Sequence, residues 1–283
     1  MTTRPRSHCQ YRPVGMAPAA ARLYPEPMQT GLEGRTALVT GASRGIGKAT
    51  AAALAAEGCN VVLSSRRQEA LDAVAEELRS AYPKVGFLAQ AAHVGEPDQA
   101  QVCVAKAIET FGSVDVLVNN AGTNPYYGPM VDLDVPRAEK TVQVNQLSIV
   151  LWTQAVWHAS MKQTGGAIVN IASVGGLATE PGIGYYNATK AAVIHLTRQF
   201  AAELGPGVRV NAIAPGIVRT QLARALWENH EEALNNALPL GRIGEPADIA
   251  QAVVFLAGTA SSWMTGHTVV IDGGALVKHS LSN

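Results

Sequence analysis

Residues 36–47 read Thr-Ala-Leu-Val-Thr-Gly-Ala-Ser-Arg-Gly-Ile-Gly, and this stretch decides the fold. A short apolar run, three glycines and the alanine-rich residues 48–57 predict a strand, a tight turn and a helix. Glycines let the backbone approach a pyrophosphate, and the free N–H groups of a helix N-terminus favour its charge. The spacing is Gly-x-x-x-Gly-x-Gly, which departs from the general Gly-x-Gly-x-x-Gly pattern. The segment predicts a dinucleotide site formed by Gly41, Ser43, Arg44, Gly45, Ile46 and Gly47.

The same alternation of apolar runs and helical stretches continues along the chain from Arg35 to Ile271. Parallel strands joined by helices form a sheet that is covered on both faces. The sequence therefore predicts an α/β fold, a Rossmann-type doubly wound parallel sheet of seven strands in a single domain over residues 31–283. The expected strands lie near residues 36–40, 60–64, 85–88, 115–118, 167–171, 208–213 and 268–271.

The turn after the second expected strand bears on the choice of cofactor. In a site for NAD an acidic residue binds the ribose hydroxyl there, whereas arginine suits the 2′-phosphate of NADP. The strand Asn60–Ser64 runs into Ser65, Arg66 and Arg67, and no carboxylate stands at that turn. Guanidinium groups match phosphate with a planar fork of donors. We therefore expect NADP(H), held by Ser65 and Arg66 with Arg44 nearby, and we expect Arg67 to be exposed.

Tyr186 and Lys190 stand four residues apart in Tyr-Asn-Ala-Thr-Lys, thirteen residues after Ser173. On a helix this spacing places both side chains on one face. A nearby cation favours the phenolate and lowers the pKa of a tyrosine towards neutral pH, where a general acid works best. We therefore expect Tyr186 to act as a proton donor, Lys190 to lower its pKa, and Ser173 to hold the substrate oxygen.

These residues resemble the short-chain dehydrogenase/reductase superfamily over roughly residues 32–274. Asn119-Asn120-Ala121-Gly122 is similar to that family's segment after the fourth strand, and Asn145 resembles the asparagine of its catalytic tetrad. The resemblance implies that Asn145 holds a water that links Lys190 to solvent, and that Lys190 binds the nicotinamide ribose. It implies further cofactor contacts at His93, Val94, Asn120, Ala121, Gly122, Pro215, Gly216, Val218 and Thr220, and at Tyr186 and Lys190 themselves.

One position departs from the family pattern. His93 stands where most members have an aspartate that contacts the adenine. A histidine can stack on the base or hydrogen-bond to it, and its protonation near pH 6–7 would make cofactor affinity depend on pH. The other interpretation is that His93 packs beside the base without titrating.

Residues 124–128, Asn-Pro-Tyr-Tyr-Gly, and the segment Arg224–Trp227 resemble two groups within the family. One is the 3-oxoacyl-acyl-carrier-protein reductases, and the other is the NADPH-dependent carbonyl and retinal reductases. We therefore expect reduction of a ketone to an alcohol, first on a 3-oxoacyl thioester and alternatively on apolar aldehydes and ketones. A third reading is a cofactor-binding scaffold without chemistry, which the intact tetrad disfavours. The basic residues available to meet a carrier are Arg137, Lys140, Arg219 and Arg224.

Residues 220–240 interrupt the alternation. The resemblance implies that the helix-like insertion over Gln221–Leu238 closes over the substrate as a lid, with Trp227 as a core anchor or a substrate contact. Further expected walls of the substrate site are Tyr126, Tyr127, Leu177 and Tyr185. The resemblance also implies a homotetramer assembled through residues 147–161 and 191–204 and through the C-terminal strand.

Composition excludes several classes of function. The formal net charge is zero, so no basic stripe for nucleic acid or anionic lipid is expected. No apolar run reaches the length of a membrane helix.

Three cysteines without a Cys-x-x-Cys pair indicate free thiols and a cytoplasmic location. The histidines show no metal-ligand spacing, so no metal is expected. Five prolines before residue 28 predict a flexible N-terminal extension over residues 1–30.

Overall fold

The structure, a computed structural model, describes residues 30–277. The flexible extension expected over residues 1–30 therefore lies outside the described residues, apart from Thr30. The hydroxyl of Thr30 donates a hydrogen bond of 2.9 Å to Glu57.

Seven parallel strands form one sheet in the order β3-β2-β1-β4-β5-β6-β7. Every pair of neighbours is parallel, as the sequence predicts. The strands are β1 (Thr36–Thr40), β2 (Asn60–Ser65), β3 (Phe87–Ala91), β4 (Val116–Asn119), β5 (Gly166–Ile171), β6 (Val208–Pro215) and β7 (Thr268–Ile271). The Rossmann-type α/β fold is thus confirmed.

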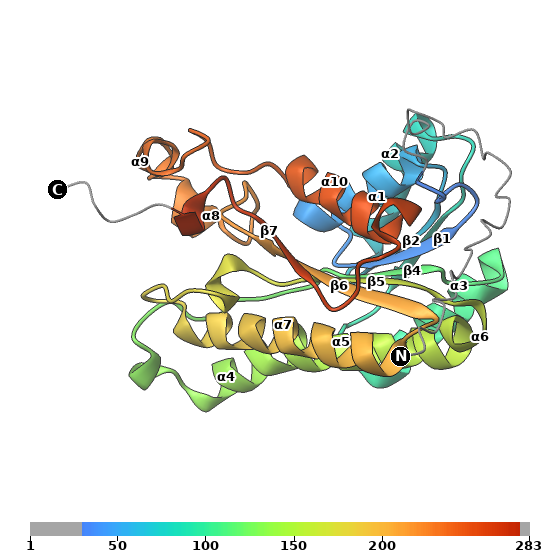
Figure 1. Ribbon diagram of the computed structural model, residues 1–283, viewed down its shortest axis with the longest axis horizontal. Helices are drawn as coiled ribbons and strands as arrows, with labels where there is room; N and C mark the ends of the chain where they lie inside the picture. The colour runs from blue at the N-terminus through green and yellow to red at the C-terminus, as the bar shows by residue number, and fades with distance from the viewer. Residues whose placement is uncertain (1–29, 278–283) are drawn as a thin grey trace, which may run out of the picture.

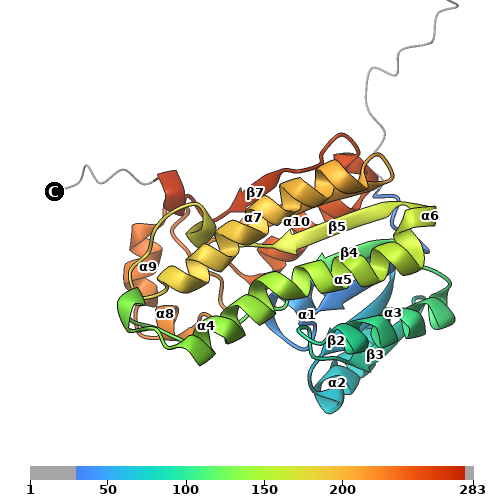
Figure 2. The same cartoon turned by 90° about the horizontal axis from the view of Figure 1, so that it is seen from below.

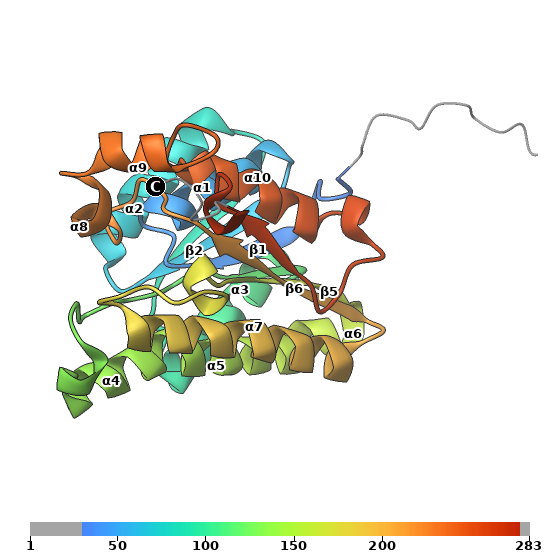
Figure 3. The same ribbon diagram turned by 60° about the vertical axis from the view of Figure 1, so that its left-hand side comes forward.

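Helices cover both faces of the sheet (Figures 1 and 3). One layer holds α1 (Gly45–Ala56), α2 (Gln68–Ala81) and α10 (Pro246–Ala257). The opposite layer, which faces the viewer in Figure 2, holds α3 (Pro97–Phe111), α5 (Ser148–Val156) and α7 (Gly184–Leu204). The shorter helices are α4 (Val135–Val142), α6 (Lys162–Thr164), α8 (Arg224–Trp227) and α9 (Glu231–Ala237). Single turns are η1 (Met130–Asp132), η4 (Val174–Gly176), η5 (Thr259–Ser261) and η6 (Ala275–Val277), and two π-helical segments are η2 (Gln143–Leu147) and η3 (Trp157–Met161).

The core forms two main apolar layers because each strand sends alternate side chains to opposite faces. In β1, Ala37 and Val39 pack with the layer of α1 and α10, while Leu38 packs with the layer of α3 and α5. In β2, Val61 and Leu63 face the first layer and Val62 the second. Because both faces are buried, these strands read as continuous apolar runs, which is why they can be found in the sequence.

The chain runs outward from β1 to β3 and then returns to the other side of β1 to form β4. In open sheets of this kind the ligand lies beyond the carboxyl ends of the strands, where the strand order reverses. The glycine turn follows β1, Asn120 follows β4, Ser173 follows β5 and Gly216 follows β6. The fold therefore collects the candidate residues at one edge of the sheet.

Two expectations about local structure are wrong. The third strand begins at Phe87, not at residue 85, because Val85 and Gly86 lie in a turn whose Gly86 N–H donates to the side chain of Asn60. The insertion over Gln221–Leu238 is not one helix but the two short helices α8 and α9. The break at residues 228–230 contains Asn229 and His230, which favour turns over helix interiors.

Candidate active site

The glycine turn between β1 and α1 is packed too tightly for any other residue at its centre. A Cβ atom on Gly47 would lie 2.3 Å from the carbonyl oxygen of Gly41, and Gly41 itself has a φ of +66°. The residue that precedes α1, Arg44, makes no side-chain cap. The first N–H groups of α1, starting at Gly45 and Ile46, therefore point beyond the helix without a helical partner. This cradle fits the pyrophosphate of a dinucleotide.

Asn120 supports the cradle from β4. Its side-chain amide donates to the carbonyl oxygens of Thr40 (2.8 Å) and Gly41 (3.3 Å). The backbone N–H groups of Asn120 and Ala121 both donate to the hydroxyl of Thr40. The structure thus gives Asn120 the task of fixing the glycine turn, and Thr40 is a supporting residue that the sequence analysis missed.

Two arginines lie beside the cradle with their charges unmatched. Within residues 30–277, the guanidinium groups of Arg44 and Arg66 form no hydrogen bond and no ion pair. Arg66 follows Ser65, the last residue of β2, and both arginines are exposed, as is Arg67. The residues present therefore fit a nicotinamide dinucleotide that carries an additional phosphate on its ribose.

His93 follows β3 and is held by a lysine from a distant helix. Lys140 of α4 lies 3.0 Å from Nε2 of His93, and the N–H of Gly95 lies 3.2 Å from Nδ1. Burial and the charge of Lys140 lower the pKa of His93, and Arg66 acts in the same direction. The imidazole is thus kept neutral around neutral pH. Val94, the next residue, is buried, and its carbonyl accepts a hydrogen bond from Trp152.

Ser173, Tyr186 and Lys190 meet beyond the end of β5. The hydroxyl of Ser173 lies near the phenol of Tyr186, where it opposes the rise in the pKa of that phenol, and it accepts the N–H of Gly175 at 3.1 Å. The ammonium of Lys190 lies 5.6 Å from the centroid of the Tyr186 ring. It donates a hydrogen bond of 2.7 Å to the carbonyl oxygen of Ile171. The helix α7 thus brings phenol and ammonium to one face, as their spacing predicts.

The ionisation of this pair differs from the expectation. Burial raises the pKa of Tyr186 to about 12, although the Ser173 hydrogen bond opposes the change, and the negative charge of Glu180 adds to it. Burial also lowers the pKa of Lys190 to about 8. Lys190 is not among the groups that shift the pKa of Tyr186, and its ammonium donates to a backbone carbonyl. That Lys190 lowers the pKa of Tyr186 therefore stays a prediction.

Asn145 lies in the π-helical segment η2, where the helix between α4 and α5 is locally widened. Its amide donates to the carbonyl oxygen of Thr123 (2.9 Å) and to the hydroxyl of Thr189 (3.1 Å), and its oxygen accepts the N–H of Thr123 (2.7 Å). A Cβ atom on Gly122 would lie 3.7 Å from both Asn145 Oδ1 and Lys190 Nζ. Asn145 and Lys190 are thus close neighbours around a glycine. Thr123 and Thr189, which clamp Asn145, were missed by the sequence analysis.

The turn after β6 lies opposite the glycine cradle. Pro215 ends the strand, and a Cβ atom on Gly216 would lie 2.8 Å from the Cα of Asp272. Val218 is buried and bridges to Gly244. Thr220 lies next to Gly45, where an added Cβ would meet its methyl group at 3.3 Å. This turn therefore closes the second side of the cradle.

The segment after Thr220 is held together by Arg219. Its guanidinium forms a double hydrogen bond with Glu231 of α9, donates to Glu245 at 2.8 Å and stacks over the ring of Trp227 at 5.2 Å. The indole N–H of Trp227 donates to the carbonyl oxygen of Thr220. Trp227 is thus an anchor of this segment, which is one of the two interpretations that its sequence allows.

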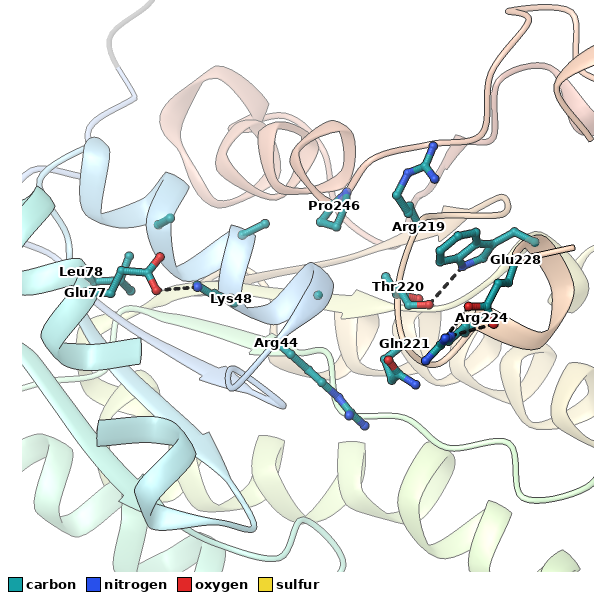
Figure 4. A pocket seen from close by; sticks show the side chains of 14 residues that line it. Arg44, Lys48, Glu77, Leu78, Arg219, Thr220, Gln221, Arg224, Glu228 and Pro246 are labelled. Atoms are coloured by element: carbon teal, nitrogen blue, oxygen red, sulfur yellow. Dashed lines mark hydrogen bonds and ion pairs between the residues drawn. The ribbon is translucent and has the colours of Figure 1, made fainter. Parts of the chain in front are cut away.

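A cleft of about 620 Å³ separates α1 and α2 from this segment. Figure 4 shows the Lys48–Glu77 ion pair on one side and the Arg224–Glu228 pair on the other, with Arg44 between them. Tyr186 does not line this cleft. It lines a separate narrow cavity, together with Tyr126, Met130, Leu133, Ile183 and Tyr185.

Two features are absent from the described residues. No group of three or more histidine, cysteine, aspartate or glutamate side chains within residues 30–277 could hold a metal ion. In the same part of the chain, no helix has the length and apolar character needed to cross a membrane.

The chain is similar to known proteins along most of its length. The family described as Enoyl-(Acyl carrier protein) reductase matches residues 41–275. The human protein "Dehydrogenase/reductase SDR family member 4" is 37% identical over 246 residues, which cover 86% of this chain and 88% of the relative. The "3-oxoacyl-[acyl-carrier-protein] reductase FabG" of Thermotoga maritima is 38% identical over 247 residues, which cover 87% of this chain and 99% of the relative.

The fold is shared with solved structures of the same kind. A short-chain type dehydrogenase/reductase from Mycobacterium marinum superposes with a TM-score of 0.83 at 35% identity, covering 88% of this chain and 98% of the other. These similarities span the glycine cradle, the Ser173–Tyr186–Lys190 cluster and the turn after β6. The chain belongs to the short-chain dehydrogenase/reductase family and is an oxidoreductase that works with a nicotinamide cofactor, NAD(P)(H).

Proposed function

We propose that this protein reduces a carbonyl compound to an alcohol with NADP(H). The observation that carries the proposal is the cluster in which the Ser173 hydroxyl and the buried ammonium of Lys190 lie beside the Tyr186 phenol. A hydroxyl and a phenol that converge on one point suit an oxygen that gains negative charge during a reaction. The glycine cradle lies at the same edge of the sheet.

The choice of NADP(H) rests on the end of β2. Ser65 and Arg66 stand there without a carboxylate, and the guanidinium groups of Arg66 and Arg44 are unmatched among the described residues. A 2′-phosphate would meet both positive charges, whereas the ribose hydroxyl of NAD would find no acidic partner. We further propose that His93 lies against the adenine with its Nε2 occupied by Lys140.

Each side chain of the cluster has a separate task in the proposed reaction. Nicotinamide supplies the hydride when it is bound. Tyr186 keeps its proton at neutral pH because its pKa is raised, and it donates that proton to the developing alkoxide. Ser173 holds the same oxygen. Lys190, which hydrogen-bonds to Ile171 and has a pKa lowered to about 8, can pass a proton towards Tyr186, and Asn145 lies beside it.

Two substrate classes are considered, and one of them is suggested by a relative named as a 3-oxoacyl-acyl-carrier-protein reductase. For this chain we considered first a 3-oxoacyl thioester and then a free aldehyde or ketone. The structure favours the second class, because three of the four basic residues available to meet a phosphorylated carrier are already paired with carboxylates. Arg137 pairs with Asp134, Lys140 with His93, Arg219 with Glu231 and Glu245, and Arg224 with Glu228.

Three further assignments remain part of the proposal. A scaffold without chemistry is disfavoured, because Asn145, Ser173, Tyr186 and Lys190 are assembled in one place. A homotetramer is proposed, with residues 147–161 and 191–204 at its interfaces, and the exposed side chain of Leu147 supports it. A cytoplasmic location is supported by Cys59 and Cys103, which are buried free thiols.

Replacing the phenol tests the proposed role of Tyr186 directly. In Tyr186→Phe the ring remains but the proton donor is lost, so kcat for a ketone should fall by about 10²–10⁴-fold. The Kd for NADPH, measured by fluorescence, should stay within about twofold. The matched control is Tyr82→Phe, which removes a phenol hydroxyl at the end of α2, outside the site, and should keep kcat. Retention of more than about a tenth of the wild-type kcat in Tyr186→Phe would contradict the proposed acid.

A further inference from the structure

Asn187 stands next to Tyr186 in α7 and has no part in the chemistry proposed above. Its side chain is buried, with 6% of its surface exposed. Within residues 30–277, neither the oxygen nor the nitrogen of its amide has a hydrogen-bond partner. A buried polar group without a partner lowers the stability of a protein, so its presence needs a reason. An amide that costs stability beside the proposed acid is therefore a candidate for a task in the reaction.

The amide packs against the turn that carries Ser173. This turn, η4, follows β5 and contains two glycines. A Cβ atom on Gly175 would lie 2.0 Å from Oδ1 of Asn187, 2.6 Å from its Cγ and 3.1 Å from its Nδ2. These are the three nearest atoms, so the amide lies against the face of Gly175 from which a side chain would project. Asn187 and Gly175 therefore interlock.

The second glycine joins the same turn to the backbone of α7. A Cβ atom on Gly176 would lie 2.7 Å from the carbonyl carbon of Lys190 and 2.8 Å from the backbone nitrogen of Ala191. The turn also closes on itself, since the N–H of Gly176 donates to the carbonyl oxygen of Ser173 at 2.9 Å. The turn and α7 thus meet in direct contact at both glycines, and a change on α7 is transmitted to the turn.

Gly175 also orients the hydroxyl of Ser173. The N–H of Gly175 donates to Ser173 Oγ at 3.1 Å. A hydroxyl has one proton to donate and two lone pairs that accept. Because the N–H of Gly175 uses a lone pair, the proton of Ser173 is left for the substrate oxygen of the proposed reaction. The contacts run from the Asn187 amide to Gly175, and from Gly175 to Ser173.

We propose that Asn187 is a positioning residue for Ser173 and acts through Gly175. Its amide keeps Gly175 in the position from which the N–H orients the Ser173 hydroxyl. In this role Asn187 touches neither the carbonyl group nor the cofactor. The inference rests on the proposed carbonyl reduction and adds to it a residue outside the catalytic tetrad.

A pair of alanine substitutions tests the interlock, with kcat measured on acetoacetyl-CoA and on nonan-2-one as loss of NADPH absorbance. Gly175→Ala places a methyl group against the Asn187 amide and shifts the turn, so kcat should fall by about 10–100-fold. Asn187→Ala removes the support of the turn, so kcat should fall by about tenfold. In the double variant the new methyl group meets no amide, and kcat should exceed that of Gly175→Ala by at least about fivefold. Losses that multiply overturn the inference.

A background without the Ser173 hydroxyl separates positioning from general support of the fold. In Ser173→Ala, the further change Asn187→Ala should lower kcat by less than about twofold, because the group that Asn187 positions is already gone. In every variant the Kd for NADPH should stay within about twofold of the wild-type value. An Asn187 that only supports the fold would lower kcat in both backgrounds and weaken the binding of NADPH. Either result overturns the inference.

Thr50→Val is the matched control. Thr50 lies in α1, on the opposite face of the sheet from α7, and is fully buried. Its hydroxyl likewise has no hydrogen-bond partner in the described part of the chain. The substitution removes an unpartnered polar group of similar size, and kcat should stay within about twofold of wild type. An equal loss of kcat in Thr50→Val and Asn187→Ala contradicts a specific role for Asn187.

Melting temperatures test the contact without turnover. Gly175→Ala should lower the melting temperature by about 3–10 °C because the core is overpacked there, and the double variant should regain most of this loss. If the wild type reduces no carbonyl, the proposed function fails. Regain in the double variant then still supports the coupling of Asn187 to the turn, and no regain overturns it. If the wild type is active and the losses of kcat multiply, the reaction stands and the positioning role of Asn187 is wrong.

Discussion

At the scale of single residues, the proposed preference for NADP(H) depends on Arg66. Arg66→Asp replaces a guanidinium, which attracts the 2′-phosphate, by a carboxylate. The carboxylate repels that phosphate and can accept a hydrogen bond from the ribose hydroxyl of NADH. Charge-assisted hydrogen bonds contribute about 1.5–3 kcal/mol, so the preference for NADPH over NADH in kcat/KM should fall by about 10–100-fold. The neighbouring Arg67→Asp is the matched control and should change it by less than threefold. An unchanged preference in Arg66→Asp, or an equal loss in both variants, would refute the assignment.

The lowered pKa of Lys190 makes the stability of the folded protein depend on pH. Burial lowers its pKa from the ordinary 10.5 to about 8 in the folded protein. Between these values the unfolded chain binds a proton that the folded chain does not, so the free energy of unfolding should rise with pH from about 8 to 10.5. The rise should be at most roughly 3 kcal/mol. It should be absent in Lys190→Met and present in the exposed control Lys84→Met.

Urea unfolding at pH 7.5 and pH 10 measures this difference. Above about pH 10 the raised pKa of Tyr186 acts with the opposite sign, because the folded protein then holds a proton that the unfolded chain loses. Equal curves for wild type and Lys190→Met would show that the ammonium is not buried in solution.

At the scale of elements, the helix α10 is tied to β6 by one arginine. The guanidinium of Arg209 donates to the carbonyl oxygens of Leu256, Ala257 and Gly258 and to the hydroxyl of Ser261, at 2.8–3.1 Å. A cation at a helix C-terminus stabilises it and satisfies its last carbonyls. The end of α10 is thereby fixed against the sheet.

Arg209→Met should therefore lower the free energy of unfolding by about 2–4 kcal/mol, since half-buried carbonyls lose their donors. The matched control is Lys84→Met, an exposed cation outside the proposed interfaces, which should change it by less than about 0.5 kcal/mol. Chemical unfolding of the three proteins provides the comparison. Equal stability of Arg209→Met and wild type would mean that water replaces the guanidinium without cost.

The elements also mark the limit of what the sequence predicts. The strands β1, β2, β5 and β6 can be found because burial on both faces leaves uninterrupted apolar runs. The widened helix around Asn145 cannot, because a π-helical segment arises from packing and not from local propensity. The contact between Lys140 and His93 joins residues 47 positions apart, so no local pattern contains it. The separation of α8 from α9 likewise depends on how Arg219 gathers side chains from both sides.

At the scale of the whole molecule, the candidate site is assembled from the ends of six strands, so a ligand there should stabilise the entire sheet. At about a hundredfold above its Kd, NADPH should add roughly 2.7 kcal/mol. For a domain of this size the melting temperature should then rise by about 5–10 °C. Scanning fluorimetry with NADPH and with NADH at the same concentration gives the test. Equal shifts for the two cofactors would contradict the preference for the phosphate.

The polar contacts of the segment 219–248 are mostly internal. Arg219 binds Glu231 and Glu245, Arg224 binds Glu228, Arg242 binds Asp248, and the side chain of Asn235 accepts the N–H of Ile243. Because both partners of each contact lie within the segment, the segment forms one structural unit. We therefore expect that residues 221–243, which follow Thr220 of the cradle, can be replaced by a segment of another shape while cofactor binding is kept.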